Sequence, residues 1–480
     1  MSSPPSPFGA RAVALRVLLD AEDGREYASD LLEKALEEDR VSALDRSLAT
    51  ALVYATIRHR GTLDRILDAF SKVETEKMEP WMRWILRLAA CQLLFLEKIP
   101  AYAALDEAAE QAKRHRDLRA AGFATGVLRA LQRAIVRIEA DASPKAASAA
   151  PEEESEWRKS LGEALEERWP DLPHRRLVPI PGGRRAIFDR DLWPDPWQEP
   201  AGFAGQMLSH PVWLVRRWLA KFGAAAAVGA MEAGNGHPPM VIRVNALKAT
   251  REKLVERLRG EKVEVDEKRL HVAHTGPVGR LESFKDGWFA VQDEAAQRVA
   301  PMVQAKAGEL VADLCAAPGG KTAQLAEGGA RVVAADSELG KVKGMGKSFE
   351  RLGVKSHLAL ADAKQPPFGR VFDAVLVDVP CSNTGVLSRR VEARWRLRDR
   401  DLHVLARVQR RILDAAVAVT KPGGRVVYST CSLEEEENET LVRAAIREGN
   451  GLTLEEELKI LPGPEWTCGG YAARIRLMAR

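Results

Sequence analysis

Residues 313–322 read Asp-Leu-Cys-Ala-Ala-Pro-Gly-Gly-Lys-Thr, and they follow the apolar pair Leu310 and Val311. An apolar strand that ends in a Gly-Pro turn and opens a helix is how a doubly wound α/β domain brings backbone N–H groups close to a nucleotide-like ligand. The spacing matches neither the Gly-x-Gly-x-x-Gly nor the Gly-x4-Gly-Lys-Thr phosphate loop. The stretch therefore favours a cofactor that has no phosphates.

Short Val/Ala/Leu runs recur after this turn and predict a parallel sheet whose strands are buried on both faces. The predicted strands cover residues 310–314, 331–336, 357–362, 372–378 and 425–429. Three of them end in Asp336, Asp362 and Asp378, and ligands in open α/β sheets sit at the carboxyl ends of strands. Asp336 lies about 20 residues past the turn, the place from which an acid binds ribose hydroxyls. We expect the three carboxylates to converge on one crevice with the glycine turn.

The five cysteines, Cys91, Cys315, Cys381, Cys431 and Cys468, show no CxxC motif or regular spacing. This pattern argues against a disulfide framework and against a zinc site, so a reducing cytoplasm is the expected compartment and no metal is expected. The amino-terminal residues lack a signal pattern, and no apolar run reaches the length that spans a bilayer. The formal charge of +4 is only mildly basic and does not by itself indicate nucleic acid.

Two of these cysteines follow predicted strand ends, in Pro380-Cys381-Ser382 and in Thr430-Cys431-Ser432. Together with residues 313–322 and the Lys-Pro-Gly-Gly run at 421–424, these motifs resemble those of the Sun (RsmB-like) group of RNA cytosine-5 methyltransferases. The resemblance implies a Rossmann-like domain that binds S-adenosylmethionine. The cofactor-binding residues that it implies are Cys315, Ala316, Ala317, Pro318, Gly319, Gly320, Lys321, Asp336, Asp362 and Asp378.

The chemistry of cytosine explains why such an enzyme needs cysteine. C5 of the ring is a poor nucleophile until a thiolate adds at C6 and turns the ring into an enamine. By the resemblance, Cys431 is the nucleophile, Cys381 helps to expel the product, and Asp378 hydrogen-bonds the cytosine ring near the methyl group. The role of Lys321 is left open, apart from fixing the charge of the site and its loop. Cys91 and Cys468 are interpreted as buried structural thiols.

The remaining domains are predicted from helical periodicity, composition and the same resemblance. We expect an all-α NusB-like RNA-binding domain at 8–138, a flexible linker at 139–156, an irregular but docked Trp/Pro-rich connector at 157–208, an RRM-like α/β lobe at 209–295, and the Rossmann-like methyltransferase domain at 296–480. The acidic run 434–437 is interpreted as a solvated helix start.

Candidate RNA contacts come from two regions. The resemblance points to Arg243 and Asn245, for which a salt bridge and a turn cap are the alternatives. The stretch 387–396 is the densest basic segment with an aromatic residue, and its Arg389, Arg390 and Arg394 are expected to contact RNA phosphates beside the proposed chemistry.

The sequence thus predicts a monomeric, cytoplasmic methyltransferase that acts on C5 of a cytosine in RNA, with small-subunit (16S) ribosomal RNA as the expected substrate. The target base has to leave its stack to reach a thiolate, which favours single-stranded or loop RNA. Two alternatives stay open. One is a DNA cytosine-5 methyltransferase that uses Cys381. The other is a non-catalytic RNA-binding factor of ribosome assembly or antitermination that keeps the fold.

Overall fold

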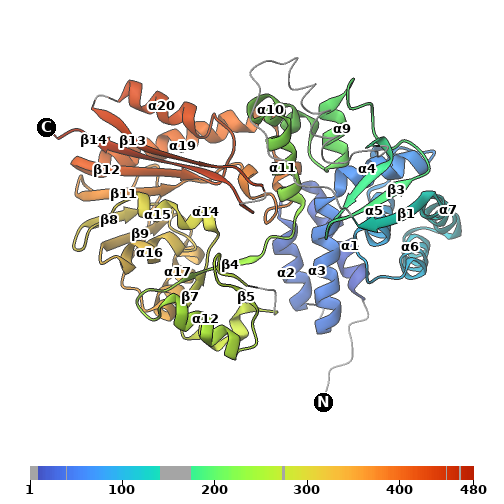
Figure 1. Ribbon diagram of the computed structural model, residues 1–480, viewed down its shortest axis with the longest axis horizontal. Helices are drawn as coiled ribbons and strands as arrows, with labels where there is room; N and C mark the ends of the chain where they lie inside the picture. The colour runs from blue at the N-terminus through green and yellow to red at the C-terminus, as the bar shows by residue number, and fades with distance from the viewer. Residues whose placement is uncertain are drawn as a thin grey trace. The chain divides into compact units, whose positions relative to one another are not determined.

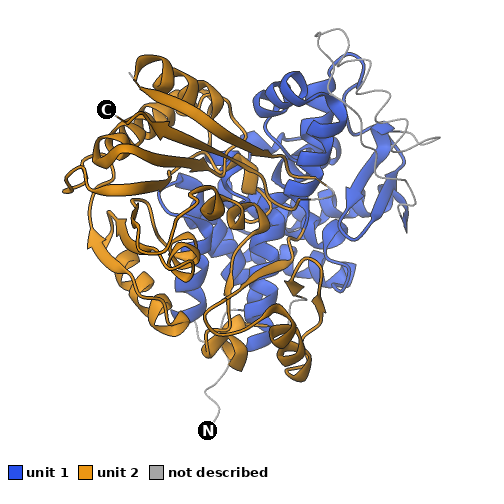
Figure 2. Ribbon diagram, turned by 60° about the vertical axis from the view of Figure 1, so that its left-hand side comes forward, with its two compact units in different colours: residues 1–236, 390–396 blue, residues 237–389, 397–480 orange. Residues whose placement is uncertain are grey.

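The computed structural model describes residues 9–38, 41–140, 174–272, 276–449, 451–463 and 466–479 (Figure 1). Its contacts divide the chain into two compact units, one of residues 1–236 with 390–396, and the other of residues 237–389 with 397–480 (Figure 2). Most of the predicted linker and the tryptophans at 157 and 169 lie outside the described residues. No helix in the described ranges is long and apolar enough to cross a membrane.

The first unit is built mainly from helices, as the three- and four-residue spacing of its apolar side chains predicts. Its helices are α1 (Ala10–Asp20), α2 (Ala28–Glu38), α3 (Ala43–Arg58), α4 (Arg60–Phe70), α5 (Pro80–Phe95), α6 (Ala101–His115), α7 (Leu118–Ala134), α9 (Pro200–Met207), α10 (Val212–Phe222), α11 (Ala224–Asn235) and α18 (Ala393–Arg396). Helix α5 begins at a proline, where the missing N–H costs no intrahelical bond, and it is buried along most of its length.

The unit is not all helical, and the connector is not irregular where the structure describes it. Strands β1 (Ile135–Ala140), β2 (Leu177–Ile180) and β3 (Arg184–Phe188) form an antiparallel sheet in the order β1-β3-β2. Trp193 is 1% exposed, and its indole N–H donates to the Leu177 carbonyl at 2.7 Å. Trp193 is thus buried and bonded to another residue of the connector, whereas Trp197 is exposed.

The second unit contains a small lobe with a four-stranded antiparallel sheet in the order β5-β6-β4-β7. Its elements are β4 (Met240–Val244), α12 (Arg251–Gly260), β5 (Val265–Asp266), β6 (His271–Val272), α13 (Glu282–Lys285) and β7 (Phe289–Val291). Ile242 and Phe289 from the sheet pack on Leu254 and Leu258 of the helix, and all four side chains are fully buried. A helix covering one face of a small sheet is the α/β lobe that the sequence predicts.

The rest of the unit is a seven-stranded sheet in the order β10-β9-β8-β11-β12-β14-β13. Its strands are β8 (Leu310–Asp313), β9 (Arg331–Asp336), β10 (His357–Leu360), β11 (Phe372–Asp378), β12 (Thr420–Thr430), β13 (Leu452–Ile460) and β14 (Gly470–Leu477). The first five of these are parallel, as predicted, and β13 and β14 add an antiparallel pair that the sequence analysis did not predict.

Helices cover both faces of this sheet. They are α14 (Glu294–Gln297), α15 (Val299–Met302), α16 (Gly320–Glu327), α17 (Leu339–Leu352), α19 (Asp399–Val419) and α20 (Glu439–Glu448). Val375 and Val377 of β11 pack with Leu413 of α19 on one face. Leu376, between them in sequence, packs with Val303 on the opposite face. This alternation of one strand between two apolar layers explains its continuous hydrophobic sequence.

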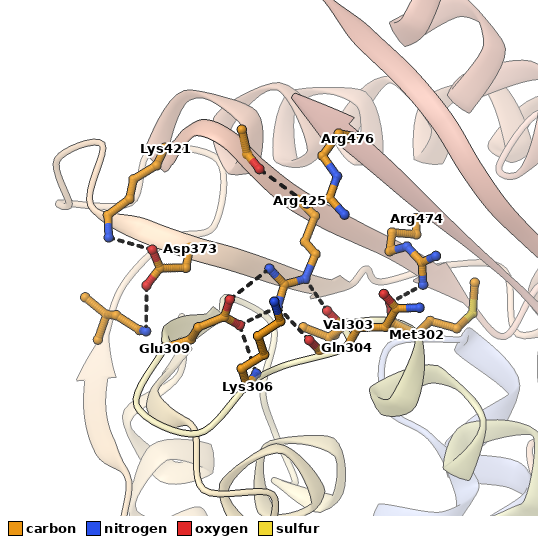
Figure 3. A network of polar contacts seen from close by, with 12 residues as sticks. Met302, Val303, Gln304, Lys306, Glu309, Asp373, Lys421, Arg425, Arg474 and Arg476 are labelled. Carbon is orange, nitrogen blue, oxygen red and sulfur yellow. Dashed lines mark hydrogen bonds and ion pairs between the residues drawn. The ribbon is translucent and has the colours of Figure 1, made fainter. Parts of the chain in front are cut away.

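A polar network joins the amino ends of the central strands (Figure 3). Arg425 of β12 pairs with Glu309, which precedes β8, and donates to the carbonyl of Gln304 at 2.8 Å. Lys421 reaches Asp373 at 2.6 Å, and Asp373 in turn accepts from the Leu310 amide at 2.9 Å. Because these contacts all lie at the amino ends of the strands, they support the sheet from the edge opposite the predicted crevice.

Candidate active site

The sheet order places the candidate site where the direction of strand addition reverses. From β8 the chain adds β9 and β10 on one side, and then β11 and β12 on the other. The crevice beyond the carboxyl ends of β8 and β11 is therefore the topological switch point at which such sheets bind ligands. The glycine turn follows β8, and Asp378 ends β11.

The turn after β8 is held in a shape that only glycine allows at its last position. Gly319 has φ +101°, and a Cβ there would come within 2.7 Å of the Phe349 ring. The peptide bond between Ala317 and Pro318 is cis. The amide of Ala317 donates to Asp336 Oδ2 at 3.3 Å, which fixes the turn to the carboxyl end of β9. Two of the predicted cofactor segments are thus joined directly.

The other predicted cofactor residues differ in exposure. The Asp362 side chain is 51% exposed, and the backbone N–H of Lys364 lowers the pKa of its carboxyl group. Cys315 is half-buried, and burial raises the pKa of its thiol, as do the acids around it. A carboxylate that stays ionised in contact with solvent suits a hydroxyl-rich or cationic ligand, whereas the protonated thiol of Cys315 contributes mainly apolar surface.

Lys321, at the start of α16, forms an ion pair within the crevice. Its Nζ lies 2.6 Å from Asp378 Oδ2, and the other carboxylate oxygen of Asp378 accepts from Ser429 Oγ at 2.6 Å. Burial alone would lower the pKa of the Lys321 ammonium, but the attraction of Asp378 outweighs it, so that the pKa is raised. The role that the sequence left open for Lys321 therefore includes charge compensation of Asp378.

Behind this pair lies a carboxyl group that the sequence analysis did not single out. Asp313, the last residue of β8, is 1% exposed and accepts from the Thr322 hydroxyl at 2.7 Å. Burial raises the pKa of Asp313 to about 7, although the Thr322 hydroxyl and the Lys321 charge both act to lower it. Asp313 is the first of residues 313–322, but its burial depends on the strands beside β8 and could not be predicted from that segment alone.

The two motif cysteines meet although they are 50 residues apart in sequence. The distance between Cys381 Sγ and Cys431 Sγ is 3.2 Å, and both are free thiols. Cys431 Sγ also donates to Asn383 Oδ1 at 3.2 Å. The contact with Cys431 and burial raise the pKa of Cys381 well above its usual value, so Cys381 keeps its proton at neutral pH. The arrangement places one protonated thiol beside a second thiol.

A cavity opens beside these groups. Lys321, Asp378 and Cys431 line one part of its wall, and Asp293, Thr430 and Tyr471 line others. Cys381 is not among the lining residues. Of the three catalytic residues predicted from the sequence, Cys431 and Asp378 therefore line the cavity, and Cys381 contacts Cys431.

The cavity wall includes the Gly-Gly pair at 469–470, where the backbone passes close to neighbouring carbonyls. A Cβ on Gly470 would come within 2.5 Å of the Thr430 carbonyl, and the Gly469 amide donates to Gly385 at 2.7 Å. Cys468 beside it lines the cavity and is 3% exposed, and burial raises its pKa to about 11. Cys91 is fully buried in α5, in agreement with its structural interpretation.

Three of the five predicted RNA contacts are corrected by the structure, because their side chains are buried and bonded within the protein. Arg243 is 7% exposed and pairs with Glu327, which is the salt bridge named as its alternative. Asn245 is fully buried and donates to the carbonyls of Gly287 and Leu352. Arg394 is fully buried as well.

The other two arginines keep some accessibility. Arg389 pairs with Asp293 and donates to the Pro239 carbonyl at 2.9 Å, and its side chain is 30% exposed. Arg390 is exposed. The contacts with RNA phosphates that the sequence suggested therefore stay a prediction for these two residues.

The acidic run 434–437 is not a solvated helix start, which corrects a further expectation. Glu437 is fully buried and Glu434 is 1% exposed, whereas Glu435 faces solvent. In the described residues no group of three or more His, Cys, Asp or Glu side chains could hold a metal ion.

Comparison with known proteins identifies the family to which this site belongs. Residues 300–463 match the family described as 16S rRNA methyltransferase RsmB/F, residues 9–133 match the NusB family, and residues 210–273 match the RsmF/B-like ferredoxin-like domain. These matches agree with the helical domain, the small lobe and the methyltransferase domain that the sequence predicts.

Two relatives span nearly the whole chain. The ribosomal RNA small subunit methyltransferase B of Sodalis glossinidius is 30% identical over 98% of each chain. A protein of Bacillus subtilis named probable ribosomal RNA small subunit methyltransferase B is 31% identical over 91% of this chain and 88% of its own. The chain therefore belongs to the RsmB/F family of 16S rRNA methyltransferases, as the sequence resemblance indicated.

Solved structures show the same fold at lower identity. The crystal structure of PH0851 is similar with a TM-score of 0.68 and 23% identity, covering 99% of each chain. A methyltransferase homologue from Pyrococcus horikoshii has a TM-score of 0.50 at 24% identity, covering 59% of this chain and all of its own. At these identities the likeness establishes the architecture alone.

The cofactor of this family is S-adenosylmethionine, and the crevice fits it. The glycine turn presents backbone without side chains at Gly319, where Phe349 already occupies the space of a Cβ. Asp336, Asp362 and Asp378 would supply acceptors for ribose hydroxyls and negative charge for a sulfonium. Asp336 and Asp362 would hold the nucleoside, and Asp378 would face the methyl group.

Proposed function

We propose that this protein methylates C5 of a cytosine in small-subunit (16S) ribosomal RNA through a covalent bond between Cys431 and C6 of the ring. The observation that carries the proposal is the 3.2 Å contact between two free thiols, one of which lines the cavity together with Asp378 and Lys321. The names of the relatives support ribosomal RNA as the substrate. A reducing cytoplasm is part of the proposal, because an oxidised thiol pair has no thiolate to add to a base.

The reaction begins when the thiolate of Cys431 bonds to C6, and the C5=C6 electron pair becomes available at C5. S-adenosylmethionine would supply the methyl group from an electrophilic sulfonium, whose S–CH3 bond breaks and leaves its electron pair on the sulfur of the thioether product. C5 takes the methyl carbon, the C5 proton is lost to a base, and the electron pair of that C–H bond restores C5=C6 while the C6–S bond breaks. Asp378, held by Lys321 and Ser429, accepts a hydrogen bond from the ring and keeps it aligned.

The positions of the two thiols support different roles for them in this proposal. Cys431 lines the cavity, whereas Cys381 does not line it and keeps its proton. A protonated thiol 3.2 Å from the departing sulfur can donate a hydrogen bond to the thiolate that forms on release. This geometry favours Cys431 as nucleophile and Cys381 as the residue that assists release, over the DNA-type alternative in which Cys381 attacks.

Methyl transfer to unmodified 16S ribosomal RNA, followed by bisulfite mapping, tests the proposal. We expect one modified cytosine with the wild-type protein, no covalent RNA adduct with Cys431→Ala, and an adduct that persists with Cys381→Ala. Transfer to DNA that depends on Cys381 alone would support the DNA-type alternative. Binding of RNA and cofactor without any methyl transfer would support the non-catalytic one.

A further inference from the structure

Glu437 connects the two loops that carry the cysteines. One carboxylate oxygen accepts from the Ser382 amide at 2.9 Å and from Gln409 Nε2 at 2.7 Å. The other accepts from the hydroxyls of Ser382 and Ser432, each at 2.5 Å. Ser382 follows Cys381 and Ser432 follows Cys431 in sequence. One buried carboxylate therefore binds the residue next to each thiol.

The neighbouring contacts make this connection rigid. Gln409 of α19 also donates to the Pro380 carbonyl at 3.0 Å, and the Tyr428 hydroxyl donates to the backbone carbonyl of Glu437 at 2.6 Å. Asn438 donates to the Ser432 carbonyl at 2.9 Å. Both loops thus contact Glu437, which precedes α20, in addition to the contacts that they make with each other.

Glu437 is not placed to react with a substrate. It is fully buried, it does not line the cavity, and its two carboxylate oxygens already accept four hydrogen bonds, which is the full capacity of the group. A carboxylate in this state cannot serve as the general base for the C5 proton without breaking these bonds. Its contacts instead join the two residues that follow the thiols in sequence.

We propose that Glu437 is a positioning residue that sets the separation of Cys381 and Cys431, so that attack and release occur on the same ring. The catalytic consequence of this proposal rests on the proposed function. The effect of Glu437 on the separation of the two sulfur atoms does not. Removing the carboxylate takes away an acceptor that four donors share, and the contact that joins the two loops beside the thiols is lost. A displacement of about 1 Å at a reacting group can cost roughly a hundredfold in rate.

Thiol trapping measures the separation without any RNA. Diamide, a thiol-specific azo oxidant, takes two electrons and two protons from the pair, forms the Cys381–Cys431 disulfide and is reduced to its hydrazine. We expect fast trapping in the wild type and in Glu435→Gln, the matched control in the exposed part of the same acidic run. In Glu437→Ala we expect trapping to slow by about tenfold or more.

Glu437→Gln provides the conservative comparison. Its amide oxygen can still accept from Ser382 N and Gln409, and its amide N–H can donate to the hydroxyl oxygens, so trapping should fall between the wild type and Glu437→Ala. In RNA assays this variant should form the covalent adduct but accumulate it, because release depends on the displaced Cys381. A general loss of structure would lower adduct formation and release together, and would also weaken cofactor binding.

A folded Glu437→Ala protein that is trapped at the wild-type rate overturns the proposal. If Glu437→Ala does not fold, the rate of disulfide trapping is measured in Ser382→Ala and Glu437→Gln instead. A wild-type trapping rate in both variants would equally refute the positioning role. Failure of the wild-type protein to form any RNA adduct would refute the proposed function, and the trapping comparison would still decide the role of Glu437.

Discussion

Lys321 Nζ lies 2.6 Å from Asp378 Oδ2, and the pair joins the helix that follows the glycine turn to the end of the neighbouring strand β11. The Lys321 side chain is 16% exposed and that of Asp378 is 35% exposed, so the pair is only partly screened by solvent. The pair therefore places a positive charge beside the Asp378 carboxylate, in a cavity where a base and a sulfonium are expected to meet.

Replacing Lys321 by Met should lower methyl transfer by roughly tenfold to a hundredfold, because Asp378 loses the partner that orients it. Stability should fall by about 1–3 kcal/mol, less than for a fully buried pair, since Asp378 retains access to water. Single-turnover methyl transfer and denaturant unfolding measure the two effects. Lys285→Met, which removes a surface pair with Glu282, should change neither. If Lys321→Met transfers methyl groups at the wild-type rate, the ion pair has no role in catalysis.

Gly319 provides a test of the cofactor turn. Substitution by Ala places a Cβ within 2.7 Å of the Phe349 ring at a φ of +101°, which disfavours any residue except glycine. We expect S-adenosylmethionine binding to weaken by about tenfold or more, with a loss of about 1–3 kcal/mol in stability. Calorimetric titration measures the affinity.

Gly340→Ala is the matched control for this prediction. Gly340 lies in α17, has no atom within 4 Å of an added Cβ, and does not have a positive φ. Because alanine favours a helix interior, this variant should gain up to about 1 kcal/mol in stability and keep its cofactor affinity. Equal weakening of cofactor binding in both variants would contradict the turn geometry.

The parallel part of the sheet could be predicted because its strands are buried on both faces and are continuous apolar runs. Strand β13 could not, since it lies at the edge of the sheet and carries Glu455, Glu456 and Glu457, whose partners include arginines on β14. Its burial pattern has no apolar periodicity to detect. The strand becomes recognisable only when its ion pairs across the sheet are known.

The site shows the same division between local and non-local information. The glycine turn and the cysteine motifs are local, so their residues could be named from the sequence. The burial of Glu437 depends on Ser382, Gln409 and Ser432, which come from separate segments. Arg243 could bind either a phosphate or a carboxylate, and only the position of Glu327 decides between them. The residues of a local motif can thus be predicted from the sequence, whereas the contacts that support them cannot.

The raised pKa of Asp313 predicts that the stability of the folded protein depends on pH. Burial raises its pKa to about 7 in the folded protein, against an ordinary value of 3.8. Between these two values the folded state binds more protons than the unfolded state, so the free energy of unfolding falls as pH rises, by at most about 1.4 kcal/mol per unit for one group. The contribution of protonated Asp313 to stability is fully present below its ordinary pKa of 3.8, and it is lost as pH rises through about 7.

Asp313→Asn should remove this dependence, because its amide oxygen can still accept from Thr322 and does not titrate. Denaturant unfolding at several pH values between 4 and 8, compared with the wild type, measures the difference. The variant should gain stability relative to the wild type as pH rises, with the difference levelling off above 7. A difference that stays constant across this range would mean that Asp313 titrates normally.

Arg390 and Arg394, four residues apart in one basic segment, should have opposite effects. Arg394 is fully buried and donates to the carbonyls of Ser209 and Gly234 and to Asn235 Oδ1. Burial lowers the pKa of its guanidinium to about 9. Arg394→Ala leaves these acceptors without a donor, and we expect a loss of about 2–4 kcal/mol in stability.

Arg390 is exposed, so Arg390→Ala should leave stability unchanged. If it contacts a phosphate of single-stranded RNA, its removal lowers the slope of log K against log salt by about 0.7, with similar weakening for all sequences. RNA binding measured at several salt concentrations tests this, with Arg476→Ala, on β14, as a basic control. An unchanged slope in Arg390→Ala would remove the segment 390–396 from the RNA surface, because its other arginine from the sequence prediction, Arg394, is already committed to the protein interior.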